Sequence, residues 1–252
     1  MKTFGIPAFE DNYIWCIEHN GTAAVVDPGD EAPVLAHLAH NGLRLGAILV
    51  THHHGDHSGG IAALVQRFDV PVFGPAGEDI AGVTVKLREG DTVNVPGIGA
   101  PFSVIDVPGH TRGHIAYYRP NQLFCGDTLF ACGCGRLFEG TAAQMAGSLH
   151  KLAQLPGDTE VYCAHEYTQS NIRFARAVEP ENAALSARSG QVDDLRARRL
   201  PTVPSTIELE RATNPFLRCE VPQVAATARS HGAADSSPLA VFAALREWKN
   251  RF

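Results

Sequence analysis

The segment Thr51–His57 is the densest group of chemically reactive side chains in the chain. Histidine or aspartate fills five of the six positions 52–57, although all 252 residues contain only 12 histidines. Imidazole and carboxylate groups are the ligands that zinc and similar divalent metals take in proteins. His52 and His54 are two positions apart, so in an extended segment their side chains point the same way. Asp56 and His57 follow Gly55, where the chain can turn toward a second ion.

Three later segments place a further ligand directly after a short apolar stretch, as the histidine segment itself does. His110, Asp127 and His165 are these ligands, and strand ends of this kind commonly carry the chemistry of α/β proteins. One ion does not need as many ligands as this set provides, so we expect two ions. Asp127 is the expected bridge between them, because a carboxylate offers two oxygens. The expected metal ligands are His52, His54, Asp56, His57, His110, Asp127 and His165.

Composition excludes several classes of protein. The net charge of −6 provides no basic surface for nucleic acid. No apolar run approaches about 18 residues, so we expect no membrane span, and we find no signal peptide. The six cysteines are scattered, and Cys132-Gly-Cys134 has no second pair to complete a soft metal site. We therefore expect free thiols and a reducing cytoplasmic location. We also expect a monomer.

The elements that must position these ligands alternate up to about residue 166. Asn20-Gly21 predicts a type I′ hairpin between strands at 13–19 and 22–26. A helix is expected over 32–41, ending before Gly42. Short strands are expected before each ligand segment, and a helix is expected over 141–153. This mixture predicts two sheets with helices outside them.

After about residue 167 the strand signals give way to helical ones. Helices are expected over 168–177 and 181–200, with Gly190 as a possible interruption. Ser205 is the expected cap of a further helix, and Ser237-Pro238 begins the last one. We therefore expect two domains, 1–166 and 167–252.

Several motifs resemble those of one enzyme family. Val26–Gly29 and the histidine segment are similar to the metallo-β-lactamase superfamily, and Ala8–Trp15 is similar to the family's opening strand. Cys132–Gly140 and Asn214–Arg218 narrow the resemblance to its hydroxyacylglutathione hydrolases, also called glyoxalase II. The resemblance implies an α+β fold. Its parts would be an αββα catalytic sandwich over 1–166 and a helical substrate-binding domain over 167–252.

The resemblance also implies how the ligands divide. It assigns His52, His54 and His110 to a first ion, Asp56, His57 and His165 to a second, and Asp127 to both. Asp56 and Asp127 would be the catalytic carboxylates. Zinc is the expected metal, although iron and manganese accept the same ligands. Two such ions would activate water near neutral pH and polarise a thioester carbonyl. A thiol of pKa about 8.5 leaves as thiolate without a strong acid.

The substrate implied by the resemblance is a thioester of glutathione. S-D-lactoylglutathione would give D-lactate and glutathione, the second step of methylglyoxal detoxification. Arg246 and Lys249 would share a helix face and bind carboxylates, although a solvated helix end is the alternative. Phe138 stands where many members carry tyrosine. The expected substrate-binding residues are Arg136, Phe138, His165, Tyr167, Arg246 and Lys249.

Other interpretations remain open at this point. The same scaffold could carry a single-iron glutathione persulfide dioxygenase, a lactam or phosphoester hydrolase, or a structural metal site. A full second set of ligands and the long helical region favour the dinuclear thioesterase. Asp27 either bonds a ligand imidazole or makes an Asx turn. We expect His53 and His114 to be structural.

Overall fold

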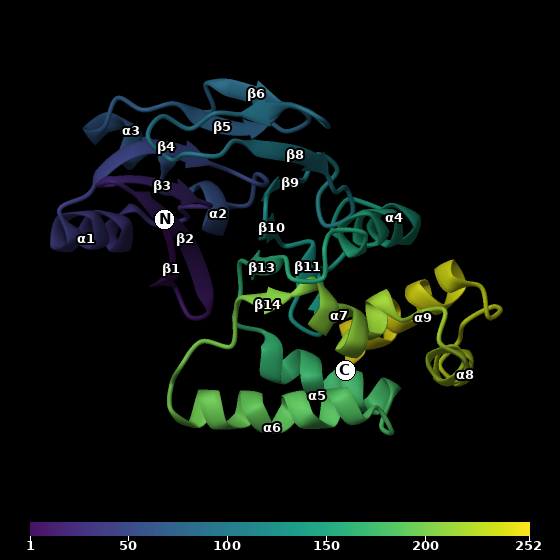
Figure 1. The fold of residues 1–252 in the computed structure, drawn as a ribbon. Coiled ribbons are helices and arrows are strands. Elements are labelled where there is room, and N and C mark those ends of the chain that lie inside the picture. Colours follow the sequence, from purple (N-terminus) through teal and green to yellow (C-terminus); the bar gives the residue numbers. More distant parts are fainter. The chain divides into compact units, whose positions relative to one another are not determined.

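The computed structural model describes residues 1–252, which form two compact units. The first unit contains residues 1–106 and 112–126, and the second contains 107–111 and 127–252. Figure 1 labels their helices and strands along the chain. This division separates tightly packed parts of the chain. The expected functional boundary near residue 166 stays a prediction.

The first unit contains a mixed six-stranded sheet. Its strands follow the chain in order, with antiparallel pairing up to the third strand and parallel pairing after it. Helices α1 (Glu31–Asn41) and α3 (Ile61–Arg67) pack apolar side chains into the same core as this sheet. The strands are β1 (Lys2–Ala8), β2 (Asn12–His19), β3 (Thr22–Val26), β4 (Arg44–Leu49), β5 (Val72–Pro75) and β6 (Val85–Leu87).

A second, antiparallel sheet of the first unit packs against this one. Tyr117 joins the two sheets, because its buried hydroxyl donates to the carbonyls of Val50 and Phe73 at 2.9 and 3.1 Å. The two sheets and their flanking helices confirm the expected α+β class. The strands of the second sheet are β7 (Thr92–Val93), β8 (Phe102–Asp106), β9 (Ile115–Arg119) and β10 (Gln122–Gly126).

The second unit is mostly helical. Short strands pair as β11 (Leu129–Phe130) with β12 (Gly133–Cys134), and β13 (Glu160–Cys163) with β14 (Ser205–Thr206). Aromatic rings on three elements form much of its core, with Phe174, Phe216 and Phe242 in successive contact. The helices are α4 (Ala142–Ala153), α5 (Thr168–Val178), α6 (Ala183–Ala197), α7 (Ile207–Thr213), η1 (Pro215–Leu217), α8 (Pro222–Ser230) and α9 (Pro238–Arg251).

Most local predictions agree with these elements. The hairpin turn falls at Asn20 and Gly21, whose φ angles are 47° and 75°, and α1 ends at Gly42 in the left-handed region. Ser237 caps α9 through a bond from the backbone N–H of Ala240. Gly190 does not interrupt α6. No helix combines the length and apolar character that a membrane span requires.

Other local predictions were wrong. The expected opening strand over 8–15 is interrupted: residues 9–11 form the turn between β1 and β2, with Phe9 at a φ of 52°, and residues 12–15 belong to β2. The cap of α7 is Thr206, which accepts from the N–H of Leu209, because the Ser205 hydroxyl bonds Glu210 instead. The region beyond 167 contains β14, where strand signals were weak.

Candidate metal centre and adjoining cavity

The histidine segment follows β4 and continues into α2 (Gly55–Ser58). The backbone of Gly29 lies directly against this segment, at Asp56. A Cβ atom on Gly29 would lie only 1.9 Å from the carbonyl oxygen of Asp56, so no other residue fits this approach. Asn12 also donates to the Asp56 carboxylate at 3.0 Å. The segment is therefore contacted by the loop after β3 and by β2.

The predicted ligands of the first unit converge in pairs. Nε2 of His52 lies 3.1 Å from Nδ1 of His54, and Nε2 of His57 lies 3.4 Å from a carboxylate oxygen of Asp56. The rings of His52 and His57 are 4.1 Å apart between centroids. The side chains of His52 and His57 are buried, so solvent has little access to them.

Asp27 bonds two residues of the histidine segment, Thr51 and the predicted ligand His57. Its Oδ2 lies 3.1 Å from Nδ1 of His57, and its Oδ1 accepts the N–H of Thr51 at 2.7 Å. The Thr51 hydroxyl donates to Asp27 and lies 3.0 Å from Nδ1 of His52. Asp27 thus bonds the imidazole of His57, as expected, and its side chain also accepts from Thr51; the role of His57 as a ligand stays a prediction. His114 stacks on His52 at 4.5 Å, consistent with a structural role.

The predicted ligands of the second unit meet at Asp127. Nε2 of His110 lies 3.4 Å from Oδ2 of Asp127, and Nε2 of His165 lies 3.4 Å from Oδ1. Each carboxylate oxygen thus faces a different imidazole, the arrangement that a bridging ligand requires. Nδ1 of His110 lies 2.9 Å from the Arg136 carbonyl oxygen, which leaves Nε2 as the nitrogen directed at Asp127.

The donor set fits divalent metal ions. It contains only imidazole nitrogens and carboxylate oxygens, which suit zinc, iron and manganese. His52, His57 and His110 each have Nδ1 within bonding distance of an oxygen, and such partners fix the tautomer of a metal-ligating histidine. Asp27 lies close enough to His52 and His57 to be considered a ligand, but its oxygens already bond Thr51 and His57. The prediction that single ions draw ligands from both units stays a prediction.

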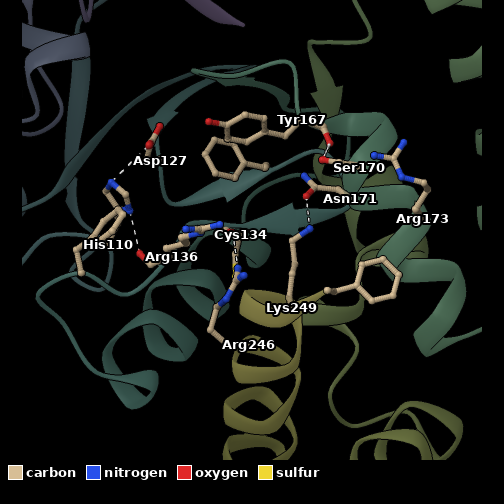
Figure 2. A pocket seen from close by; sticks show the side chains of 13 residues that line it. His110, Asp127, Cys134, Arg136, Tyr167, Ser170, Asn171, Arg173, Arg246 and Lys249 are labelled. Carbon is tan, nitrogen blue, oxygen red and sulfur yellow. Dashed lines mark hydrogen bonds and ion pairs between the residues drawn. The ribbon is translucent and has the colours of Figure 1, made fainter. Parts of the chain in front are cut away.

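A cavity of about 590 Å³ adjoins Asp127 within the second unit. Of the expected substrate-binding residues, Arg136, Phe138, Tyr167, Arg246 and Lys249 line it together with His110 and Asp127 (Figure 2). His165 is not among the lining residues. Its ring is stacked on that of Tyr167, with the centroids 4.7 Å apart and the planes 2° from parallel. The other lining residues are Phe130, Cys134, Ser170, Asn171, Arg173 and Phe252.

Arg246 and Lys249 are not a solvated helix end. Arg246 is only 3% exposed, and its Nη1 donates to the carbonyl oxygens of Cys134 and Gly135 at 2.8 and 3.4 Å. Lys249 is half-buried, and its ammonium donates to Oδ1 of Asn171 at 2.5 Å. Arg246 therefore holds the main chain of the cavity wall, whereas the Lys249 ammonium retains hydrogens for a further partner.

Sequence analysis missed the lining residues on α5. Tyr167 was expected, but Ser170 and Asn171 follow it at three and four positions, the spacing of one helix face. This spacing was the available signal, because a helix was already expected there. Cys134 was noticed as a possible soft ligand. Burial instead raises the pKa of its thiol, and the thiol lies beside Arg246.

Comparisons with known proteins cover nearly the whole chain. Residues 9–165 match the metallo-beta-lactamase superfamily, and residues 166–252 match the hydroxyacylglutathione hydrolase C-terminus. A hydroxyacylglutathione hydrolase of Nitrosomonas eutropha is 54% identical, with 100% of this chain and 99% of the relative covered. One from Cupriavidus taiwanensis is 56% identical over the same shares.

Solved structures share the fold at lower identity. The structure of TTHA1623 in a di-iron-bound form is 27% identical, has a TM-score of 0.61, and covers 86% of this chain and 100% of its own. The family matches together span both parts of the sequence. The chain belongs to the hydroxyacylglutathione hydrolases of the metallo-β-lactamase superfamily.

Proposed function

We propose that this protein hydrolyses S-2-hydroxyacylglutathione, with S-D-lactoylglutathione as the typical substrate, to a 2-hydroxy acid and glutathione. The observation that carries the proposal is the full-length similarity to hydroxyacylglutathione hydrolases at 54–56% identity. Methylglyoxal detoxification would use this reaction as its second step. The six free cysteines support a reducing compartment such as the cytoplasm, and we propose that the protein acts there as a monomer.

Two divalent ions, with zinc as the expected metal, would supply hydroxide at neutral pH and polarise the thioester carbonyl. His52, His54 and His110 are proposed for the first ion, and Asp56, His57 and His165 for the second. Asp127 is proposed to serve both, supported by the two imidazoles that face its separate oxygens at 3.4 Å. Asp27 and Thr51 would keep His52 and His57 in the required tautomers. Asp56 and Asp127 are the proposed catalytic carboxylates.

The cavity beside Asp127 is proposed to hold the glutathione part of the substrate. Arg136 and Lys249 offer cationic donors that suit the two carboxylates of glutathione. Phe138 and Tyr167 would flank the thioester end, because their rings contact the ligands His110 and His165. Phe138 offers no hydroxyl donor, so apolar contact is its contribution.

Direct assay distinguishes this function from the persulfide dioxygenase alternative. Purified protein loaded with zinc is incubated with S-D-lactoylglutathione, and loss of the thioester is followed by its ultraviolet absorbance. The same preparation, and one loaded with iron, are given glutathione persulfide in an oxygen electrode. Rapid thioester loss without oxygen uptake supports the proposal. Oxygen uptake with persulfide and no thioester hydrolysis would overturn it.

A further inference from the structure

Asn171 connects two parts of the cavity wall (Figure 2). The residue lies on α5 and is only 3% exposed. Its Nδ2 donates to the Ala131 carbonyl oxygen at 2.9 Å, and its Oδ1 accepts from the Lys249 ammonium at 2.5 Å. The side-chain amide thus donates to the β11–β12 hairpin and accepts from α9. These two bonds fix the amide orientation, because a flipped amide would direct a donor at the ammonium.

The Lys249 ammonium contacts two side chains of α5, Asn171 and Phe174. An ammonium has three donors, and Asn171 accepts one of them. The ring of Phe174 lies below, with its centroid 5.2 Å from Nζ. The Lys249 side chain lines the cavity, so the other ammonium hydrogens can reach a bound anion. Lys249 is thereby pre-positioned for an anionic group, instead of sampling the rotamers of a free lysine.

We propose that Asn171 is a positioning residue that holds the Lys249 ammonium ready for a glutathione carboxylate. A consequence is that substrate binding weakens at alkaline pH, where the ammonium is lost. The inference rests on the proposed function for the identity of the carboxylate. It adds a residue that does not touch the reacting atoms, and it adds a pH dependence of KM.

The groups around the Lys249 ammonium set the pH at which it loses its proton. Burial, followed by the nearby charges of Arg246 and Arg136, lowers the pKa of Lys249 to about 8. The thiols of Cys132 and Cys134 also face it, and burial raises the pKa of the Cys132 thiol to about 12 and the pKa of the Cys134 thiol above its usual value. Lys249 is therefore charged below about pH 8 and becomes neutral above it. Arg173 lines the same cavity from α5.

The test compares KM and kcat for S-D-lactoylglutathione between about pH 6.5 and pH 9.5. In the wild type, KM should rise about tenfold above the Lys249 pKa, because one charged hydrogen bond is lost, while kcat follows a separate profile. In Lys249→Arg this rise should be absent, because guanidinium does not lose its proton. Asn171→Asp places a negative charge beside the ammonium and should move the rise upward by about one pH unit.

The double variant isolates the connection between the two residues. In the Lys249→Arg background KM has no alkaline rise to shift, so adding Asn171→Asp should leave the pH profile of KM unchanged. The proposal would be overturned if the alkaline rise in KM persisted in Lys249→Arg. It would also be overturned if Asn171→Asp did not change the pH at which this rise occurs. Should Asn171→Asp fail to fold by thermal melting, Asn171→Ser replaces it. Its KM should be raised at pH 7 with kcat nearly unchanged, and equal losses in both constants would again overturn the proposal.

Failure of the proposed function would be recognisable on its own. In that case the wild type would not hydrolyse the thioester at any pH. The binding of glutathione itself is then measured by calorimetry at about pH 7 and pH 9. Binding that weakens at the higher pH in the wild type, but not in Lys249→Arg, supports the role of this pair without any catalysis. Binding with the same pH dependence in both proteins would contradict it.

Discussion

At the scale of single residues, the site depends on how the ligands are oriented as much as on which ligands are present. Asp127 faces two imidazoles with separate oxygens, at 3.4 Å each. Asp27 and Thr51 together engage the far nitrogens of His52 and His57. A ligand fixed in this way loses little freedom when a metal binds, and the loss of its partner typically costs 10–100-fold in affinity or activity.

Replacing Asp127 tests the bridge directly. Asp127→Asn keeps the shape but removes the charge and one good metal-binding oxygen. We expect kcat to fall at least about a hundredfold, because transition-state electrostatic stabilisation is lost. The melting temperature of the metal-free protein should change little. Full activity in the Asn variant with two ions retained would show that Asp127 does not bridge.

Replacing Arg246 separates substrate binding from support of the cavity wall. Arg246→Ala removes two bonds to the carbonyls of Cys134 and Gly135 from a buried position. We expect the free energy of unfolding to fall by about 3 kcal/mol, and KM to rise on the order of tenfold. Denaturant melts and steady-state kinetics measure these effects. The matched control is Arg251→Ala, an exposed residue of α9 whose ion pair with Glu247 is worth little. An Arg246 variant as stable as this control would contradict the structural role.

At the scale of elements, the β11–β12 hairpin of the cavity wall is held by α7. Glu210 accepts the N–H of Cys132 at 2.8 Å and the amide of Asn214 at 3.0 Å, and it forms a buried ion pair with Arg188 at 2.7 Å. Asn214 in turn donates to the carbonyl oxygens of Phe130 and Gly133. One helix thus fixes the main chain that leads into the cavity.

Removing Glu210 should therefore destabilise the second unit. Glu210→Ala leaves the Arg188 charge buried without its carboxylate, a loss that typically costs about 3–5 kcal/mol. Denaturant unfolding measures the change in the free energy of unfolding. Glu208→Ala, on the exposed face of the same helix, is the control and should shift it by less than about 0.5 kcal/mol. Equal effects of the two substitutions would contradict this account of the hairpin.

Sequence could predict elements that have local signals, and distinctive chemistry marked the candidate ligands, whose assignment stays a prediction. Asn20-Gly21 and Gly42 marked their turns because the left-handed backbone there favours these residue types. The histidine segment was recognisable because no packing role demands such a cluster. The Glu210–Arg188 pair and the bond from Lys249 to Asn171 were not predictable, because each joins helices distant in sequence. The strand β14 is only two residues long and carries no periodic pattern.

At the scale of the whole molecule, the predicted ligands are divided between the two compact units. Four predicted ligands belong to the first unit, His52, His54, Asp56 and His57, and three to the second, His110, Asp127 and His165. If they hold two ions together, then metal binding and the folding of both units are coupled. Exhaustive chelation should abolish activity and lower the melting temperature, and added divalent metal should restore both.

The number of metal ions per active chain tests the central claim most directly. Apoprotein is titrated with zinc, and thioester hydrolysis and bound metal are measured at each step, the latter by elemental analysis after desalting. The dinuclear account predicts that activity rises until two ions are bound per chain and then stays constant. Full activity with a single ion bound would contradict it.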